Sequence, residues 1–390
     1  MTTTERRFTS IEICAGAGGQ AVGLHNASFR HLALIEIDES AVATLRRNVG
    51  TNSQWSGCKV IQGDLTKIDP HELRLQLGLK QGDLSLLAGG VPCPPFSVAG
   101  KQLGREDERD LFPTMLDMVD EFSPRAVMIE NVRGLMDPKF ESYRKWILEQ
   151  LQSMGYAKCF WRVLEAKDYG VPQLRPRSIL VAMKPEYAQH FTWVAPEPEK
   201  QTTVADALWR SMRKRFQDSG RLGWEQAYEK WLKDAKKDVA PTLVGGSKKH
   251  GGADLGPTRA KKAWANLGVC GLGVANDPEQ MKDPDRDLFA KDGPKLTVAQ
   301  AAIIQGFPKN WHFEGRKTAA YRQVGNAFPP PVAEAVGKMI AAALAAHQEA
   351  REAAAAVEAA PKVLELPVQS ALFGPEAADL SDDLEGAVAG

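Results

Sequence analysis

Apolar runs of strand length recur through the first 130 residues, and amphipathic stretches of helix length separate them. The expected strands cover residues 8–13, 31–37, 60–62, 84–88 and 126–129. The expected helices cover residues 20–27, 40–49 and 111–122. Alternation of this kind is typical of a mostly parallel sheet with helices on both faces. We therefore predict an α/β fold built on a doubly wound sheet.

The pattern changes after about residue 190 and divides the chain into four parts. Residues 1–190 form the expected catalytic and cofactor-binding domain. Residues 191–290 combine several tryptophans with many Lys and Arg residues and show no strand–helix alternation, so we expect a small second domain of irregular structure there. A helical pattern over 291–346 indicates a return to the first domain. The acidic, Ala-rich tail at 347–390 is expected to be partly disordered.

Composition excludes several classes of protein. Apolar residues make up 43% of the 390 positions and charged residues 25%, which is typical of a globular chain with a large core. No apolar run reaches the length of a transmembrane helix, and no apolar stretch of signal-peptide type follows the first charges. Five scattered cysteines include no CxxC pair, which argues against a disulfide framework or a zinc site. We expect a cytoplasmic protein without a metal.

Charge is balanced overall but unevenly placed. Lys and Arg number 49, as do Asp and Glu. Residues 345–390 hold nine acidic and two basic side chains, which leaves that stretch at −7 and the remaining chain at +7. A basic body with an acidic, solvated end fits a protein that binds a polyanion. Many proteins carry a similar surplus, so charge alone does not decide the function.

Chemically distinctive residues follow three consecutive expected strands. The Gly-rich turn at 15–19 follows the first strand, Glu36 ends the second and Asp64 follows the third. A Gly-rich turn lets the backbone approach a ligand closely at a helix start. A carboxylate such as Glu36 can accept from both ribose hydroxyls of a nucleoside, and Asp64 can accept from an adenine amino group. Each feature alone is compatible with an ordinary loop, but together they favour an adenosine-type cofactor.

Cys93 is the most distinctive single candidate for a reactive side chain. It lies between Pro92 and the pair Pro94-Pro95, directly after a buried strand. A free cysteine is more often buried and inert. Because prolines fix φ, however, this loop presents the thiol in a defined direction, which favours a nucleophile. Glu130 ends the next strand. We therefore expect the Cys93 thiol and the Glu130 carboxyl to lie around one small ring of a substrate.

Four motifs then occur in a telling order: Gly-Gly-Val-Pro-Cys-Pro-Pro-Phe-Ser at 89–97, Glu-Asn-Val-Arg-Gly at 130–134, Gln-Leu-Arg-Pro-Arg at 173–177 and Gln-Val-Gly-Asn at 323–326. In this series the chain resembles the DNA (cytosine-5)-methyltransferases of bacterial restriction-modification systems. The resemblance covers residues 8–185 and 286–340. It implies the S-adenosylmethionine-dependent methyltransferase sheet, with one antiparallel strand near its edge, and a small target-recognition domain in the variable stretch between.

The resemblance also implies an activity and its partners. The chain would transfer a methyl group from S-adenosyl-L-methionine to C5 of a cytosine in a specific double-stranded DNA sequence, and would release S-adenosyl-L-homocysteine. The base would rotate out of the duplex, because a thiol cannot reach a stacked ring. The enzyme would act as a monomer and protect host DNA from a cognate restriction endonuclease without forming a stable complex with it.

Site residues carry over motif by motif. The implied catalytic residues are Cys93 as nucleophile, Glu130 at N3 of cytosine, and Arg175 and Arg177 beside them. The implied cofactor contacts are Ala15, Gly16, Gly18, Gly19, Glu36, Asp64, Leu65, Pro92 and Asn326. The expected DNA contacts lie in two stretches, the implied catalytic loop at 96–109 and a basic stretch at 241–262. They are Ser97, Lys101, Gln102, Arg105, Lys248, Lys249, Arg259, Lys261 and Lys262.

Departures and alternatives complete the prediction. Cys14 stands where the family commonly has Phe, Glu12 where it has Asp, and Pro94 where many members have Gln. None of these changes touches the expected thiol or carboxyl. Methylation of transfer RNA is a second hypothesis, which the long basic segment disfavours. An inactive DNA-binding homologue is a third, which the intact Cys93 and Glu130 disfavour.

Overall fold

The computed structural model describes residues 8–50, 52–92, 110–196, 201–245 and 253–359. The chain divides into two compact units, Met1–Glu349 and Ala350–Gly390. The first unit holds the sheet and every residue of the candidate site that the structure describes.

A seven-stranded sheet has the order β3-β2-β1-β4-β5-β7-β6. Its strands are β1 (Phe8–Ile13), β2 (Phe29–Glu36), β3 (Lys59–Gln62), β4 (Leu86–Gly89), β5 (Ala126–Val132), β6 (Lys158–Glu165) and β7 (Pro176–Met183). Neighbouring strands are parallel except where β7 pairs with β5 and with β6. The predicted doubly wound, mostly parallel sheet is therefore confirmed, and its one antiparallel strand lies next to the edge.

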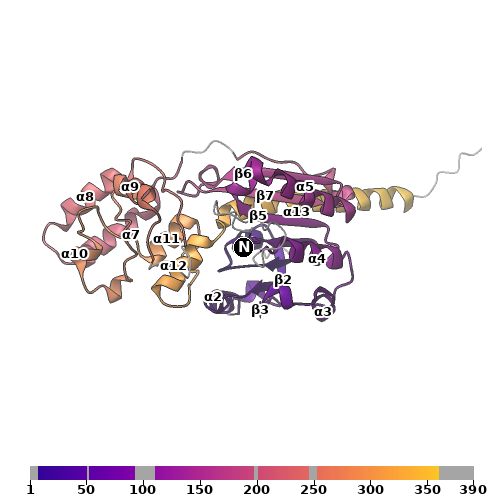
Figure 1. Ribbon diagram of the computed structural model, residues 1–390, viewed down its shortest axis with the longest axis horizontal. Helices are drawn as coiled ribbons and strands as arrows, with labels where there is room; N and C mark the ends of the chain where they lie inside the picture. Colours follow the sequence, from indigo (N-terminus) through magenta and orange to yellow (C-terminus); the bar gives the residue numbers. More distant parts are fainter. Residues whose placement is uncertain (1–7, 51, 93–109, 197–200, 246–252, 360–390) are drawn as a thin grey trace, which may run out of the picture. The chain divides into compact units, whose positions relative to one another are not determined.

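Helices cover both faces of this sheet (Figure 1). They are α1 (Gly19–Asn26), α2 (Glu39–Gly50), α3 (Pro70–Gln76), α4 (Phe112–Phe122), α5 (Glu141–Ser153), α6 (Pro185–Ala188) and α13 (Pro330–Ala359). Leu87 packs with α4 and α5 on one face, while Leu86 and Ala88 pack with α1 and α13 on the other. Successive strand residues point to opposite faces, so a strand covered on both sides is apolar throughout.

The stretch after residue 200 is more regular than we expected. It holds α7 (Val204–Asp218), α8 (Trp224–Ala235), α9 (Thr258–Asn266) and α10 (Pro284–Asp287), followed by α11 (Val298–Gln305) and α12 (Lys317–Asn326). Thr203 caps α7 in a capping box with Asp206. Apolar residues of α7, α8 and α9 share one core with α11 and α12. Figure 1 shows these helices gathered beside the sheet.

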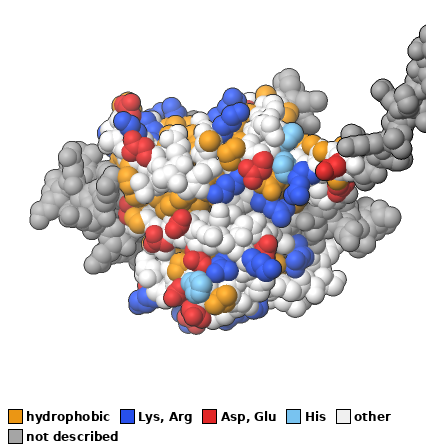
Figure 2. All heavy atoms as spheres, turned by 90° about the vertical axis from the view of Figure 1, so that its right-hand side faces the viewer, with side chains coloured by type: hydrophobic (Ala, Val, Ile, Leu, Met, Phe, Trp, Pro, Cys, Tyr) orange, Lys and Arg blue, Asp and Glu red, His pale blue; other side chains and the backbone are white. Residues whose placement is uncertain are grey.

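Short 3₁₀ helices complete the described elements: Ser53–Trp55, Leu65–Lys67, Arg133–Met136, Pro138–Phe140, Ala166–Tyr169 and Pro278–Gln280. Helix α13 continues through Ala359, so the acidic stretch that we placed at 347–390 begins as helix, and residues 360–390 lie outside the described residues. None of the described helices combines the length and apolarity needed to span a bilayer. On the face drawn in Figure 2, basic and acidic side chains are interspersed.

Candidate active site

A cavity of about 350 Å³ opens where β1, β2, β4 and β5 end. This volume lies within the range of small-molecule sites. The turn after β1, the residues after β2 and the carboxyl-terminal part of α12 form much of its wall. Of the residues predicted to bind a cofactor, the lining includes Ala15, Gly16, Gly19, Glu36, Pro92 and Asn326. The structure thus gathers into one cavity residues as far apart in the chain as Ala15 and Asn326.

Glu36 fixes the Gly-rich turn against the end of β2. Its Oε2 accepts from the Gly16 amide at 2.7 Å, and its Oε1 accepts from the amides of Ile37 and Asp38 at 2.9 and 2.8 Å. Gly16 has a φ of 54°, and a Cβ added there would meet no atom within 4 Å. A carboxylate has about four acceptor sites, so roughly one remains for a ligand hydroxyl. The turn is held in place and borders open space.

Glu12 Oε2 and Gln20 Nε2 are two of three buried polar atoms of cavity-lining residues that have no hydrogen-bond partner among the described residues; the third is Arg322 Nε. Burial and the neighbouring Glu36 raise the pKa of Glu12 well above its ordinary value. Buried polar groups are normally paired, so these two atoms indicate a polar ligand. Sequence reasoning noted Glu12 only as a departure and missed Gln20, which has no distinguishing signal in a helical first turn.

Cys14 also lines this cavity, in the position where an aromatic residue was expected from the family pattern. Burial, followed by the charges of Glu36 and Glu12, raises the pKa of its thiol to about 12. The side chain is therefore a small neutral group at pH 7. It cannot stack on a purine ring.

Glu130, which lines the cavity, forms a buried ion pair with Arg177. Arg177 Nε lies 2.7 Å from Glu130 Oε1, and the two side chains are 12% and 14% exposed. Burial raises the pKa of the Glu130 carboxyl above its ordinary value, although Arg177 and Arg175 oppose the shift. The antiparallel pairing of β5 with β7 brings the two residues together. The predicted carboxyl and one predicted arginine are thus adjacent.

The segment after β4 is fastened to the same strand. Asn131 Nδ2 donates to the carbonyl of Val91 at 2.9 Å. A Cβ added to Gly90 would lie 3.0 Å from Glu130 Oε2, so a larger residue there would require the carboxyl to shift by a few tenths of an ångström. Val91 and Pro92 directly precede Cys93 in the sequence. The described chain therefore reaches the neighbourhood of Glu130 one residue before the expected nucleophile.

Several predicted residues lie outside the described residues. They are Cys93, Ser97, Lys101, Gln102, Arg105, Lys248 and Lys249. The described chain resumes at Asp110, whose Oδ1 accepts from the Phe112 amide at 3.0 Å and whose Oδ2 accepts from the Tyr143 hydroxyl at 2.5 Å. Both chain ends that flank the interval 93–109 are thus held by buried hydrogen bonds.

Three predicted cofactor residues are not in the cavity lining. Gly18 packs on Trp311, whose ring would lie 2.8 Å from a Cβ added there. Asp64 accepts from the amide and the hydroxyl of Thr66 at 3.1 and 2.8 Å, and these bonds lower its pKa. Leu65 is a buried core residue. Their contact with a cofactor stays a prediction.

The other predicted residues take two different places. Arg175 is 1% exposed, its Nη1 and Nη2 donate to backbone carbonyls, and its Nε has no partner among the described residues. On α9, Arg259 and Lys262 are exposed, whereas Lys261 pairs with Asp254 at 2.8 Å. The described part of the expected DNA surface therefore offers two outward-facing cations.

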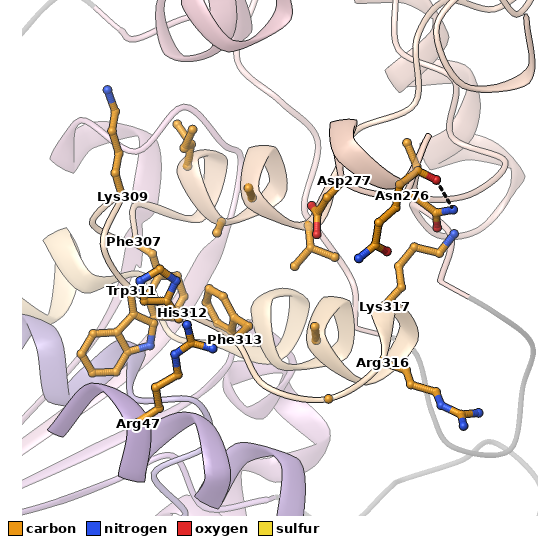
Figure 3. A pocket seen from close by; sticks show the side chains of 18 of the residues that line it. Arg47, Asn276, Asp277, Phe307, Lys309, Trp311, His312, Phe313, Arg316 and Lys317 are labelled. Carbon is orange, nitrogen blue, oxygen red and sulfur yellow. Dashed lines mark hydrogen bonds between the residues drawn. The ribbon is translucent and has the colours of Figure 1, made fainter. Parts of the chain in front are cut away.

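A second and larger cavity, of about 790 Å³, lies between α11, the loop after it and the start of α12 (Figure 3). Its charged lining residues are four cations (Arg47, Lys309, Arg316 and Lys317) and one acid (Asp277). No predicted catalytic or cofactor residue lines it. Size therefore does not identify the active site, and the smaller cavity with carboxylates at strand ends is the better candidate.

A mostly parallel sheet with one reversed strand next to its edge and a cavity at its strand ends has the architecture expected of an α/β methyltransferase. The family model for C-5 cytosine-specific DNA methylases matches residues 8–342, and the chain belongs to this family. It is 52% identical over 345 residues to the type II methyltransferase M.NaeI of Lentzea aerocolonigenes, which covers 88% of this chain and 77% of that protein. It is 48% identical over 343 residues to M.NgoMIV of Neisseria gonorrhoeae, which covers 87% and 98%.

A solved structure of a DNMT2 variant from Spodoptera frugiperda has a similar fold. Its TM-score is 0.55 at 14% identity, over 85% of this chain and 99% of that one. The chain is accordingly a DNA (cytosine-5)-methyltransferase of the type II restriction-modification kind.

Proposed function

We propose that the chain methylates C5 of a cytosine within a specific double-stranded DNA sequence, with S-adenosyl-L-methionine as the methyl donor and Cys93 as a transient covalent nucleophile. One observation carries this proposal: the cavity lined by the Gly-rich turn and Glu36 is also lined by Glu130, whose buried carboxyl is paired with Arg177. A cofactor cradle and a carboxyl able to serve a pyrimidine ring thus share one space.

The cavity suits the proposed donor. Glu36 keeps acceptor capacity for a ribose hydroxyl, and the backbone at Gly16 borders open space. The unpaired Glu12 and Gln20 atoms offer an acceptor and a donor to the amino-acid end. When bound, S-adenosyl-L-methionine supplies the methyl group that C5 receives.

Chemistry on the ring explains why a thiol and a carboxyl are both needed. Cytosine C5 is a weak nucleophile, and a bond from the Cys93 thiolate to C6 pushes electron density toward C5 and N3. A neutral Glu130 carboxyl donates to N3 and relieves that charge. Burial, which raises the Glu130 pKa, favours this protonated form. Loss of the C5 proton to a base then lets the S–C6 bond break, which restores the thiolate and the aromatic ring.

Arg177 orients Glu130 in this scheme. Its Nε holds one carboxyl oxygen, Oε1, and leaves Oε2 directed toward Gly90 and the cavity. An oriented donor costs no reorganisation when charge develops on the ring. The target base must leave the duplex to reach this carboxyl, at a cost of a few kcal/mol for unpairing.

DNA is held by cations that contact phosphates. The exposure of Arg259 and Lys262 on α9 supports this role for them. We assign contacts with DNA to Ser97, Lys101, Gln102, Arg105, Lys248 and Lys249 on sequence grounds, and to Lys261 once its pairing with Asp254 is exchanged for a phosphate. The enzyme acts as a monomer and protects host DNA from an endonuclease with the same site. The family model and the two relatives favour DNA over the RNA alternative.

Bisulfite sequencing of plasmid DNA from cells that express the chain tests this proposal. One cytosine within a recurring short sequence should resist conversion. The Glu130→Gln variant, which keeps the side chain's shape, is the matched control and should restore near-complete conversion. Uniform conversion with the wild-type chain would contradict the proposed function.

A further inference from the structure

A fully buried guanidinium joins the site to the helical region. We propose that Arg175 is a positioning residue that couples DNA binding to cofactor binding and does not touch the cytosine. It does so by tying together two short backbone segments, which we name the recognition segment (243–245) and the cofactor loop (325–327). The inference rests on the proposed function, because it assumes that both ligands bind this chain.

Arg175 binds backbone from both segments. Its Nη1 donates to the carbonyl of Leu243 at 2.6 Å. Its Nη2 donates to the carbonyls of Gly325 and Ala327 at 2.8 and 2.9 Å. The side chain is 1% exposed. A buried cation needs such acceptors, because an unpaired charge in the interior is very costly. Neither segment can move away alone without leaving the guanidinium short of a partner.

Two buried glutamines repeat this connection. Gln173 Oε1 accepts from the Leu243 amide at 2.8 Å, and Gln173 Nε2 donates to Gln305 Oε1 at 2.7 Å. Gln305 Nε2 in turn donates to the Ala327 carbonyl. A second chain of hydrogen bonds therefore runs from the recognition segment to the cofactor loop. Fully satisfied networks of this kind rigidify what they join.

The two segments also touch directly, backbone against backbone. A Cβ added to Gly245 would lie 2.3 Å from Asn326 Oδ1 and 2.5 Å from the Arg322 carbonyl oxygen. A Cβ added to Gly325 would lie 2.4 Å from the Gly245 nitrogen. Asn326 and Arg322 line the cofactor cavity. Gly245 immediately precedes the stretch that carries Lys248 and Lys249. A displacement of the recognition segment therefore acts directly on residues of the cavity wall.

Arg175 also lies two residues before Arg177, the partner of Glu130. The same buried guanidinium therefore fixes the beginning of β7, and Arg177 extends from this strand to the Glu130 carboxyl. A role of Nη1 or Nη2 at the ring would require them to give up these carbonyls, and the buried Nε is the only nitrogen of the group without a partner among the described residues. The geometry favours a residue that holds other residues in place.

Coupling between two binding sites is reciprocal and measurable. If DNA tightens cofactor binding by some factor, the cofactor tightens DNA binding by the same factor, and typical factors are about 5 to 150. Titration calorimetry with S-adenosyl-L-homocysteine, with and without a duplex that carries the methylated sequence, gives this factor for the wild-type chain. We expect a value in that range.

Two variants test the junction and one controls for it. Arg175→Lys keeps the charge but loses the planar fork. Gly245→Ala places a methyl group against Asn326. Gly273→Ala is the matched control, since its Cβ would have an ordinary contact at 3.6 Å with the Ala253 carbonyl oxygen. We expect the first two to bring the coupling factor to within about twofold of one, while Gly273→Ala keeps the wild-type value.

Thermal unfolding separates this effect from simple destabilisation, because a purely structural role lowers the Tm without changing the coupling factor. Folded Arg175→Lys and Gly245→Ala proteins with wild-type coupling would overturn the inference. If Arg175→Lys does not fold, Gly245→Ala decides alone. A wild-type enzyme that methylates DNA yet shows no coupling overturns this inference and leaves the proposed function standing, whereas failure to bind S-adenosyl-L-homocysteine overturns both.

Discussion

The ion pair between Glu130 and Arg177 predicts an energetic coupling that a double-mutant cycle can measure. Arg177→Met removes the guanidinium and leaves a carboxyl that is only 14% exposed without its partner at 2.7 Å. Breaking a buried pair from one side costs about 3–5 kcal/mol. Because both side chains keep slight exposure, we expect about 3 kcal/mol of lost stability for this variant.

The double variant completes the cycle. Glu130→Gln removes the charge that Arg177→Met leaves unpaired, so the two changes together should cost less than the sum of the single changes. We expect a coupling free energy of about 2 kcal/mol, within the range of about 0.5–3 kcal/mol for residues in contact. Urea unfolding of the wild-type chain and the three variants at pH 7 measures it. Single costs that add to within about 0.5 kcal/mol would refute the pairing.

Activity provides a second readout of the same variants. Removing a preorganised donor from a developing negative charge typically costs about 10²–10³ in rate. Single-turnover methyl transfer by Glu130→Gln should fall by that factor. Arg177→Met should also lose rate, because Arg177 maintains the orientation of the Glu130 carboxyl. Wild-type rates in both variants would remove Glu130 from the mechanism.

Three further predictions concern the cofactor cavity and the tail. Gly16→Ala puts a methyl group into the cavity at a φ of 54° and should weaken S-adenosyl-L-homocysteine binding about tenfold or more by calorimetry, equivalent to about 1.4 kcal/mol; unchanged affinity would contradict the cradle. The raised Glu12 pKa means that its stabilising contribution is complete below the pKa of the unfolded chain and is lost as pH rises through the pKa of the folded one. Glu12→Gln should therefore flatten the fall of Tm as pH rises above about 4.5; parallel curves would exclude this origin. Removal of residues 350–390, the second compact unit, should leave methyl transfer within about twofold, and an inactive truncation would assign that unit a role in the enzyme.

The sequence was sufficient to predict the sheet and the strand ends that carry the site. Glu36 and Glu130 end apolar runs, and parallel strands bring such ends to one edge, so their shared cavity follows from the pattern. Motif order supplied the reversed strand β7, which no periodicity revealed. We expected irregular structure because the stretch lacks strand–helix alternation, although the buried positions of α7 and α8 recur with helical spacing.

Long-range contacts set the limit of what the sequence could give. Arg175 bonds carbonyls 68 and 150 residues away, and no local pattern reports such partners. The motif that contains Arg177 therefore suggested that Arg175 lies beside the cytosine. In the structure, the Arg175 guanidinium lies at a junction of backbone segments. Gln20 was missed for a similar reason, since its importance arises only from the buried surroundings that leave its Nε2 without a partner.

Covalent trapping tests the central claim most directly. A duplex with 5-fluorocytosine at the methylated position cannot lose the C5 substituent as a proton, so the bond between the enzyme and C6 should persist after methyl transfer. Peptide mass mapping should then place the modified ring on Cys93, and only when S-adenosyl-L-methionine is present. Absence of any adduct with an enzyme that methylates the normal duplex, or an equal yield from Cys93→Ser, would contradict nucleophilic attack by this residue.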